Sequence, residues 1–140
     1  MKKFRSLLLR CGAALAALLP AAFTACTPST NIRRVDAAAF AQCIADTAAV
    51  VRLDVRTPAE YDAGHIPGAI NIDVQAAGFE QEALRRLPRR TIALYCRSGR
   101  RSRTAAELLA GHGYNVVELQ TGFLGWTAAG MPVEPASAAK

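Results

Sequence analysis

The chain has 140 residues, of which 51% are hydrophobic and 20% charged, and its formal net charge is +6 at pH 7. This composition excludes a disordered chain, and the length allows one domain of ordinary size but not two. Residues 1–25 hold four Lys/Arg and no acidic residue, so the rest of the chain has 13 basic and 11 acidic residues and a net charge near +2. Because no basic stripe interleaved with aromatic residues remains, no nucleic-acid partner is expected.

Residues 1–25 have the order of an export signal. A basic start is followed by a 13-residue apolar core, CGAALAALLPAAF, which is shorter than a membrane-spanning helix. The sequence FTAC, ending at Cys26, resembles the lipobox of bacterial lipoproteins, in which the cysteine becomes lipidated and N-terminal. We therefore expect an exported protein, lipid-anchored through Cys26 on the periplasmic side of a bacterial membrane, the outer membrane if the cell is Gram-negative. The alternative is plain secretion, with an unmodified Cys26 and a soluble periplasmic domain.

The polar, turn-rich sequence CTPSTN at residues 26–31 predicts a short tether between this anchor and the fold. Residues 136–140 predict a frayed tail. The folded domain is therefore expected over residues 32–135.

Strands and helices alternate along this domain. The middle strands are apolar on both faces, which is typical of a parallel sheet covered by helices on both sides. We therefore expect a single α/β domain with a mostly parallel sheet flanked by helices on both faces. Strands are predicted at residues 50–55, 69–72, 91–95 and 115–119, and helices at residues 37–46, 58–63, 79–87, 102–112 and 121–129.

Two of these helices have clear start signals. Asp36 can cap the first, whose Phe40, Cys43 and Ile44 share one face. Thr57 and Glu60 form a capping box for the second helix, and Pro58 occupies the first helical position, where a missing N–H costs nothing.

The domain contains two cysteines, Cys43 and Cys96. There is no CxxC pair and no clustered Cys/His spacing, so no metal site is expected. The position of Cys43 in the first helix predicts a small, buried apolar residue. A Cys43–Cys96 disulfide stays open as an alternative, because the spacing alone supplies no distance between them.

Cys96 follows the apolar strand at residues 91–95 and opens the loop CRSGRRSR. Only the thiolate of a cysteine is a strong nucleophile, and a helix N-terminus or nearby cations favour that form. Gly99 allows the backbone N–H groups to converge, and Ser98 and Ser102 add hydroxyl donors. The loop therefore predicts a thiolate in a cradle for a small oxyanion. The alternative is a buried cysteine beside a solvated basic surface formed by Arg97, Arg100, Arg101 and Arg103.

Three ordered motifs resemble the rhodanese family. LDVRTPAEYDAGHIPGAINI at residues 53–72 is similar to its N-terminal signature, and TGFLGWTAAGMPV at residues 121–133 to its C-terminal element. Between them, CRSGRRS fits the six-residue active-site loop, Cys96 to Arg101, of single-domain sulfurtransferases. Cysteine-dependent phosphatases need an arginine six residues after the cysteine, where this chain has Ser102, so phosphatase or arsenate-reductase chemistry is disfavoured.

The resemblance implies a double displacement. Cys96 takes the outer sulfur of a small sulfur-oxyanion donor such as thiosulfate, forms a persulfide, and passes the sulfur to a thiol or to cyanide. No metal and no organic cofactor is required. The donor-binding loop consists of Arg97, Ser98, Gly99, Arg100, Arg101 and Ser102.

The resemblance also implies supporting roles around the loop. Asp54 and Arg56 are expected to form an ion pair near it, and His65 to fix the GHIPG turn by hydrogen bonding. Glu60 stands where some larger rhodaneses have a substrate-binding arginine, and Trp126 is expected in the core. The alternatives are a non-enzymatic persulfide carrier, a partner-docking domain, and a thiol redox protein; the oligomeric state is left open.

Overall fold

The computed structural model describes residues 31–135. The predicted signal, the lipidation of Cys26, most of the tether and the tail fall outside this range. Within it, no helix is both long enough and apolar enough to cross a membrane.

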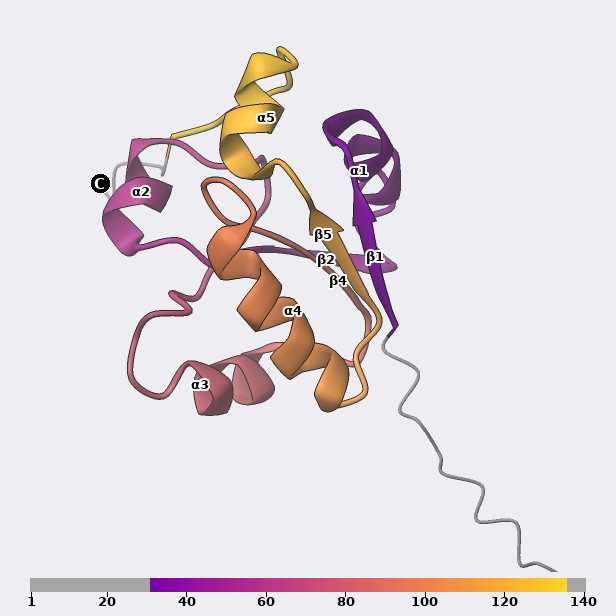
Figure 1. Ribbon diagram of the computed structural model, residues 1–140, viewed down its shortest axis with the longest axis vertical. Coiled ribbons are helices and arrows are strands. Elements are labelled where there is room, and N and C mark those ends of the chain that lie inside the picture. The colour runs from indigo at the N-terminus through magenta and orange to yellow at the C-terminus, as the bar shows by residue number, and fades with distance from the viewer. Residues whose placement is uncertain (1–30, 136–140) are drawn as a thin grey trace, which may run out of the picture.

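The domain is built on one five-stranded sheet in the order β1-β5-β4-β2-β3, and every pair of neighbouring strands is parallel (Figure 1). β4 is therefore the central strand, and its carboxyl end has neighbours on both sides. The strands are β1 (Ile32–Val35), β2 (Val50–Asp54), β3 (Ile70–Asn71), β4 (Thr91–Tyr95) and β5 (Val116–Leu119). The helices are α1 (Ala37–Cys43), α2 (Pro58–Ala63), α3 (Phe79–Arg86), α4 (Arg100–Gly111) and α5 (Gly122–Ala128).

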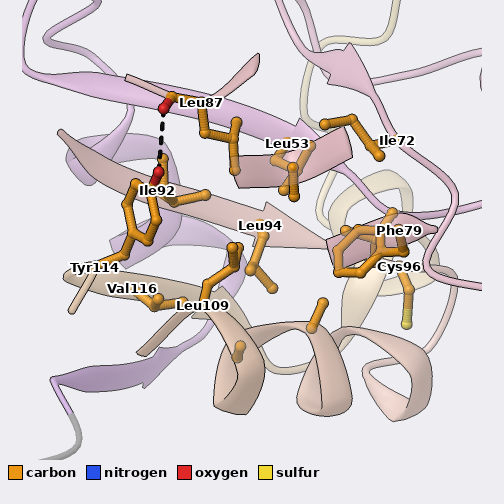
Figure 2. Close-up of a cluster of buried hydrophobic side chains, with 14 residues drawn as sticks. Leu53, Ile72, Phe79, Leu87, Ile92, Leu94, Cys96, Leu109, Tyr114 and Val116 are labelled. Carbon is orange, nitrogen blue, oxygen red and sulfur yellow. Dashed lines mark hydrogen bonds between the residues drawn. The ribbon is translucent and has the colours of Figure 1, made fainter. Parts of the chain in front are cut away.

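Helices cover both faces of the sheet, as the apolar middle strands predict. Alternate residues of β4 point to opposite faces: Ile92 and Leu94 pack with α3 and α4, whereas Ala93 and Tyr95 pack with α1 and α5. Figure 2 shows the first of these two clusters, in which the Tyr114 hydroxyl donates a hydrogen bond to the Leu87 carbonyl at 3.1 Å. Burying each large apolar side chain contributes about 1.5–3 kcal/mol, so β4 is held firmly from both sides.

The capping predictions are confirmed. The Asp36 carboxylate accepts the Ala39 N–H at 2.8 Å at the start of α1. At the start of α2, Thr57 and Glu60 form both bonds of the capping box, with Pro58 at the first helical position. These local signals set the start of α1, which precedes β2 in the chain, and of α2, which follows it.

Apart from single-residue shifts at the ends of elements, the predictions were wrong in four places. α1 ends at Cys43 instead of residue 46, and Asp46 instead accepts the N–H groups of Ala48 and Ala49 in the turn that follows. β1 was missed, because its two central arginines are exposed and only its pairing with β5 makes it a strand. α4 begins at Arg100 instead of Ser102, because Gly99 turns the chain with a φ of 90°. Cys43 is half-buried instead of buried, because α1 ends at this residue and it only borders the core.

Cys43 and Cys96 are both free thiols. Cys96 belongs to the cluster under α3 and α4, whereas Cys43 borders the cluster on the opposite face of the sheet. The alternative of a Cys43–Cys96 disulfide is therefore not realised in this fold.

Candidate active site at the Cys96 loop

Cys96 lies directly after β4, at the carboxyl edge of the parallel sheet, which is where ligands bind in folds of this kind. Figure 2 shows it at the edge of the buried cluster, and the residue is only 1% exposed. Because β4 is central and buried on both faces, the position of the sulfur is set by a strand that the core holds from both sides.

The N-terminus of α5 is joined to the loop by two backbone hydrogen bonds. The Phe123 N–H donates to the Cys96 carbonyl at 2.8 Å, and the Leu124 N–H donates to the Arg97 carbonyl at 3.0 Å. Gly99 turns the chain beside the Gln120 carbonyl, and a Cβ at this position would overlap that oxygen. Gly99 is therefore required both for its positive φ and for the close approach of two backbones.

Backbone N–H groups surround the sulfur. The Gly99 N–H donates to Cys96 Sγ at 3.2 Å. Burial raises the pKa of the Cys96 thiol, but hydrogen bonds to the sulfur outweigh burial and leave the pKa below its ordinary value. These bonds come from the Ser102 hydroxyl and from the backbone N–H groups of Ser102, Ser98 and Gly99. The thiolate is thus favoured mainly by local hydrogen bonds, and among the loop arginines the charge of Arg101 adds to them.

The Ser102 hydroxyl has one hydrogen and two acceptors. It donates to Glu118 Oε1 at 2.8 Å, and it also lies within hydrogen-bonding reach of the Cys96 sulfur. Both bonds cannot be made at once. The Glu118 carboxylate therefore competes with the Cys96 sulfur for this hydrogen, whereas the backbone N–H groups are available to the sulfur in either case.

Glu118 is a buried carboxylate that the sequence analysis missed. It projects from β5, is 1% exposed, and its second oxygen accepts a hydrogen bond from Arg34 Nε at 2.8 Å. One signal was available: Glu118 is the single charged residue in the otherwise apolar strand VVEL. A charge in a strand that is buried on both faces requires partners, which here are Arg34 and Ser102.

The loop arginines do not share one role. Arg101 forms a two-pronged ion pair with Glu60, with both N···O distances at 2.8 Å. The hydrogen bond from Arg101 is the largest cause that lowers the pKa of Glu60 to about 2. Arg101 thereby ties the loop to α2, whereas Arg97, Arg100 and Arg103 are exposed. The charge of Glu60 is thus already paired with Arg101.

The expected ion pair of Asp54 and Arg56 is confirmed. Arg56 donates to both carboxylate oxygens, to Oδ2 at 2.6 Å and to Oδ1 at 3.0 Å, and the two side chains are almost fully buried. Burial lowers the pKa of Arg56, but its hydrogen bond to Asp54 and the charge of Asp54 outweigh burial and raise that pKa. The guanidinium also lies 4.1 Å from the centroid of the Phe123 ring, so the pair joins the end of β2 to α5.

His65 fixes the turn, as expected. Its Nδ1 lies 3.0 Å from the Tyr61 carbonyl, and its ring stacks on the Tyr61 ring with the centroids 3.7 Å apart. The backbone N–H of His65 donates to the Glu134 carbonyl at 2.8 Å. Trp126 is buried, also as expected, and its indole N–H donates to the Pro132 carbonyl at 2.7 Å.

A cavity of about 270 Å³ lies beside the loop, between α2 and α5, and Arg97 is one of its walls. A larger cavity of about 510 Å³ lies over α3, but no loop residue lines it. The smaller cavity is the relevant one, because Arg97 of the loop lines it. Within residues 31–135, no group of three or more His, Cys, Asp or Glu side chains is placed to hold a metal ion.

A parallel α/β domain with one thiol in a cradle of backbone N–H groups, at the end of its central strand, indicates a protein whose chemistry is centred on a cysteine sulfur. The sequence model of the rhodanese-like domain matches residues 36–129. The chain belongs to this rhodanese-like family.

Similar proteins agree with this assignment. A sulfurtransferase of Allochromatium vinosum is 34% identical over 104 residues, which are 73% of this chain and 94% of that protein. The thiosulfate sulfurtransferase PspE of Escherichia coli is 37% identical over 68 residues, which are 47% of this chain and 64% of PspE. The crystal structure of a rhodanese-related protein from Thermoplasma volcanium has a TM-score of 0.63 and 33% identity, covering 73% of this chain and 97% of that one. These relatives support sulfur transfer as the general activity.

Proposed function

We propose that the protein moves sulfane sulfur from a small anionic donor such as thiosulfate to a thiophilic acceptor, through a persulfide on Cys96. The observation that supports this most strongly is the bond from the Gly99 N–H to Cys96 Sγ at 3.2 Å, within a loop whose hydrogen bonds lower the pKa of the thiol. Membership in the rhodanese-like family and the sulfurtransferase relatives agree with it.

The first half-reaction loads the enzyme. The Cys96 thiolate attacks the outer sulfur of thiosulfate, a new S–S bond forms, and the donor S–S bond breaks with its electron pair leaving on sulfite. In the second half-reaction, the acceptor thiolate attacks the outer sulfur of the persulfide. The electron pair of the broken bond returns to Cys96, which regenerates the thiolate.

The loop supplies the electrostatics of both steps. Backbone N–H groups that already point at the sulfur stabilise the thiolate and the persulfide anion without reorganisation. The exposed Arg97 and Arg100 attract the anionic donor. Arg101 positions the loop through its ion pair with Glu60. The Asp54–Arg56 pair positions the end of β2 next to the loop.

Mass spectrometry of the intact protein tests the loading step. Thiosulfate should add the mass of one sulfur atom, cyanide should remove it, and the Cys96→Ser variant should show no addition. No addition on a protein whose Cys96 still titrates would overturn the thiosulfate reaction and favour a carrier loaded by a partner protein. A loss of two hydrogens, restored by a reductant, would favour the thiol redox alternative.

We also propose that the protein is exported and lipid-anchored through Cys26, because the sequence FTAC precedes the fold after a basic and apolar segment. Labelling of a producing cell with a fatty acid should mark the protein, and Cys26→Ser should abolish the label and move the protein from the membrane fraction to the soluble fraction. A Cys26→Ser protein that stays in the membrane fraction would contradict this anchor.

A further inference from the structure

The amino edge of the sheet, at the opposite end of the strands from the active-site loop, presents three arginines. Arg33 lies near the start of β1, and Arg89 and Arg90 directly precede β4; all three are exposed. Arg33 lines one surface hollow, and the other two arginines line a second. The two hollows adjoin, because Thr91 and Asn115 line both of them. We call the three arginines the basic edge.

Within residues 31–135, no carboxylate is paired with the basic edge. Arg89 is held by the His112 carbonyl, to which it donates at 2.7 Å, and lies 4.7 Å from the centroid of the Tyr114 ring. Asp46, in the turn that leads to β2 at the same edge, accepts two backbone N–H groups of its own turn and pairs with no arginine of this range. The edge is therefore positively charged and suited to an anionic partner.

The position of the predicted anchor indicates which partner reaches this edge. β1 begins at Ile32, so Cys26 precedes the first strand by six residues, which span at most about 20 Å even when fully extended. Figure 1 shows the start of β1 at the opposite end of the sheet from α5. The five residues of β4 are about 16 Å long and α5 adds the diameter of a helix, so a membrane against the carboxyl edge would lie about 26 Å from the start of β1. The anchor does not reach that far, so the amino edge is the one that meets the membrane.

We propose that the basic edge lies on the headgroups of anionic phospholipids, so that the amino edge of the sheet faces the membrane and the Cys96 loop faces the water. This inference rests on the proposed anchor at Cys26 and is independent of the proposed sulfur transfer. Each arginine near an anionic membrane favours the contact about fivefold. The loop then lies about 16 Å from the lipid, which is about twice the Debye length at physiological ionic strength, so the membrane charge does not repel an anionic donor.

Fluorescent labels on the acylated protein test this orientation. The protein is reconstituted on vesicles of phosphatidylcholine, alone or with one quarter phosphatidylglycerol, that contain a lipid with a nitroxide quencher on its headgroup. One label is attached through Ala49→Cys beside the basic edge, and the matched label through Ala128→Cys at the end of α5; both alanines are exposed. Cys43→Ser and Cys96→Ser remove the other two thiols of the domain, and circular dichroism checks the fold. The mass of the purified protein is measured first, so a protein without acyl chains counts against the anchor alone.

On anionic vesicles we expect the label at position 49 to be quenched about threefold more than the label at position 128. Arg33→Gln with Arg90→Gln should reduce this ratio to its value on neutral vesicles, where only the tether orients the domain. Arg103→Gln is the matched control, because it removes an exposed arginine from the carboxyl edge and should leave the ratio unchanged. Molar salt should lower the ratio as the double variant does, because it screens the charges.

Alkylation of Cys96 gives a second measurement, on the wild-type protein and without a label. Iodoacetate is an anion and iodoacetamide is neutral, so the ratio of their rates reports the potential at the loop. Peptide masses separate Cys96 from Cys43. We expect this ratio to be the same on neutral and on anionic vesicles at physiological salt, because the loop lies beyond the Debye length.

Three results would overturn the proposal. Equal quenching at positions 49 and 128 would contradict the orientation. A quenching ratio that Arg33→Gln with Arg90→Gln leaves unchanged would show that the arginines do not contact lipid, and an anionic protein would then be the better partner for the basic edge. An iodoacetate to iodoacetamide ratio that falls as phosphatidylglycerol is added would place the Cys96 loop at the membrane.

Discussion

Two arginine–carboxylate pairs flank the Cys96 loop, and they differ in burial and in what they join. Asp54 and Arg56 are 0% and 4% exposed and lie two residues apart in the chain. Glu60 and Arg101 are 27% and 19% exposed and lie 41 residues apart in the chain. The first pair is part of the core, where a lost partner is costly, whereas the second can be broken in contact with water. We therefore expect the first to determine stability and the second to determine loop position.

Arg56→Met should have the largest effect on stability. The substitution leaves the Asp54 carboxylate buried without its cation, so the free energy of unfolding should fall by about 3–5 kcal/mol. Urea denaturation followed by circular dichroism measures this change. Arg103→Met, at an exposed position, is the control and should change stability by less than about 0.5 kcal/mol. A loss for Arg56→Met as small as that of the control would contradict the assigned role of the pair.

Arg101→Met should act on activity more than on stability. Its removal releases Glu60, whose charge then faces the approach of an anionic donor, so kcat/KM for thiosulfate should fall about tenfold. The free energy of unfolding should fall by only about 1 kcal/mol. Glu60→Gln with Arg101→Met should recover part of the lost activity, because the repelling charge is gone. An unchanged kcat/KM in Arg101→Met would show that the activity does not depend on the ion pair between Arg101 and Glu60.

The pH dependence of stability offers a third test. The pKa of Glu60 is lowered in the folded protein from 4.5 to about 2, so the unfolded chain takes up this proton first as the pH falls. The stabilisation is present above pH 4.5 and is lost as the pH falls from there toward about 2. Urea titrations should therefore show a loss of about 1 kcal/mol in that window, which Glu60→Gln lacks. If Glu60→Gln lost the same stability between pH 4.5 and about 2, other carboxylates would be responsible for the loss.

The smallest expected effect concerns a third carboxylate, Glu118. Replacing it with Gln removes the charge that holds the Ser102 hydrogen, so the hydroxyl can turn to the Cys96 thiolate. The pH midpoint of Cys96 alkylation should then move down by a few tenths of a unit. In a Ser102→Ala background the same substitution should have no effect on this midpoint. If Glu118→Gln still lowered the pH midpoint of Cys96 alkylation in the Ser102→Ala background, Glu118 would not act through the Ser102 hydroxyl.

The order of elements was predictable because local signals encode it. The Asp36 cap, the capping box of Thr57 and Glu60, and the apolar run before Cys96 depend on neighbours in the chain, and all three are confirmed. β1 was not predictable in this way, because its exposed arginines hide an edge strand that only β5 completes.

Within the site, hydrophobic runs and glycine positions specify locally that one thiol follows a buried strand and precedes a helix, so this part was predictable from the sequence. Only the tertiary structure decided which groups surround that thiol. It joined Arg101 to Glu60, placed the buried Glu118 against Ser102, and put Leu124 and Val133 at one cavity. The physical reason is that these contacts depend on strand order and helix packing, which bring together side chains whose separation along the chain has no periodic signature.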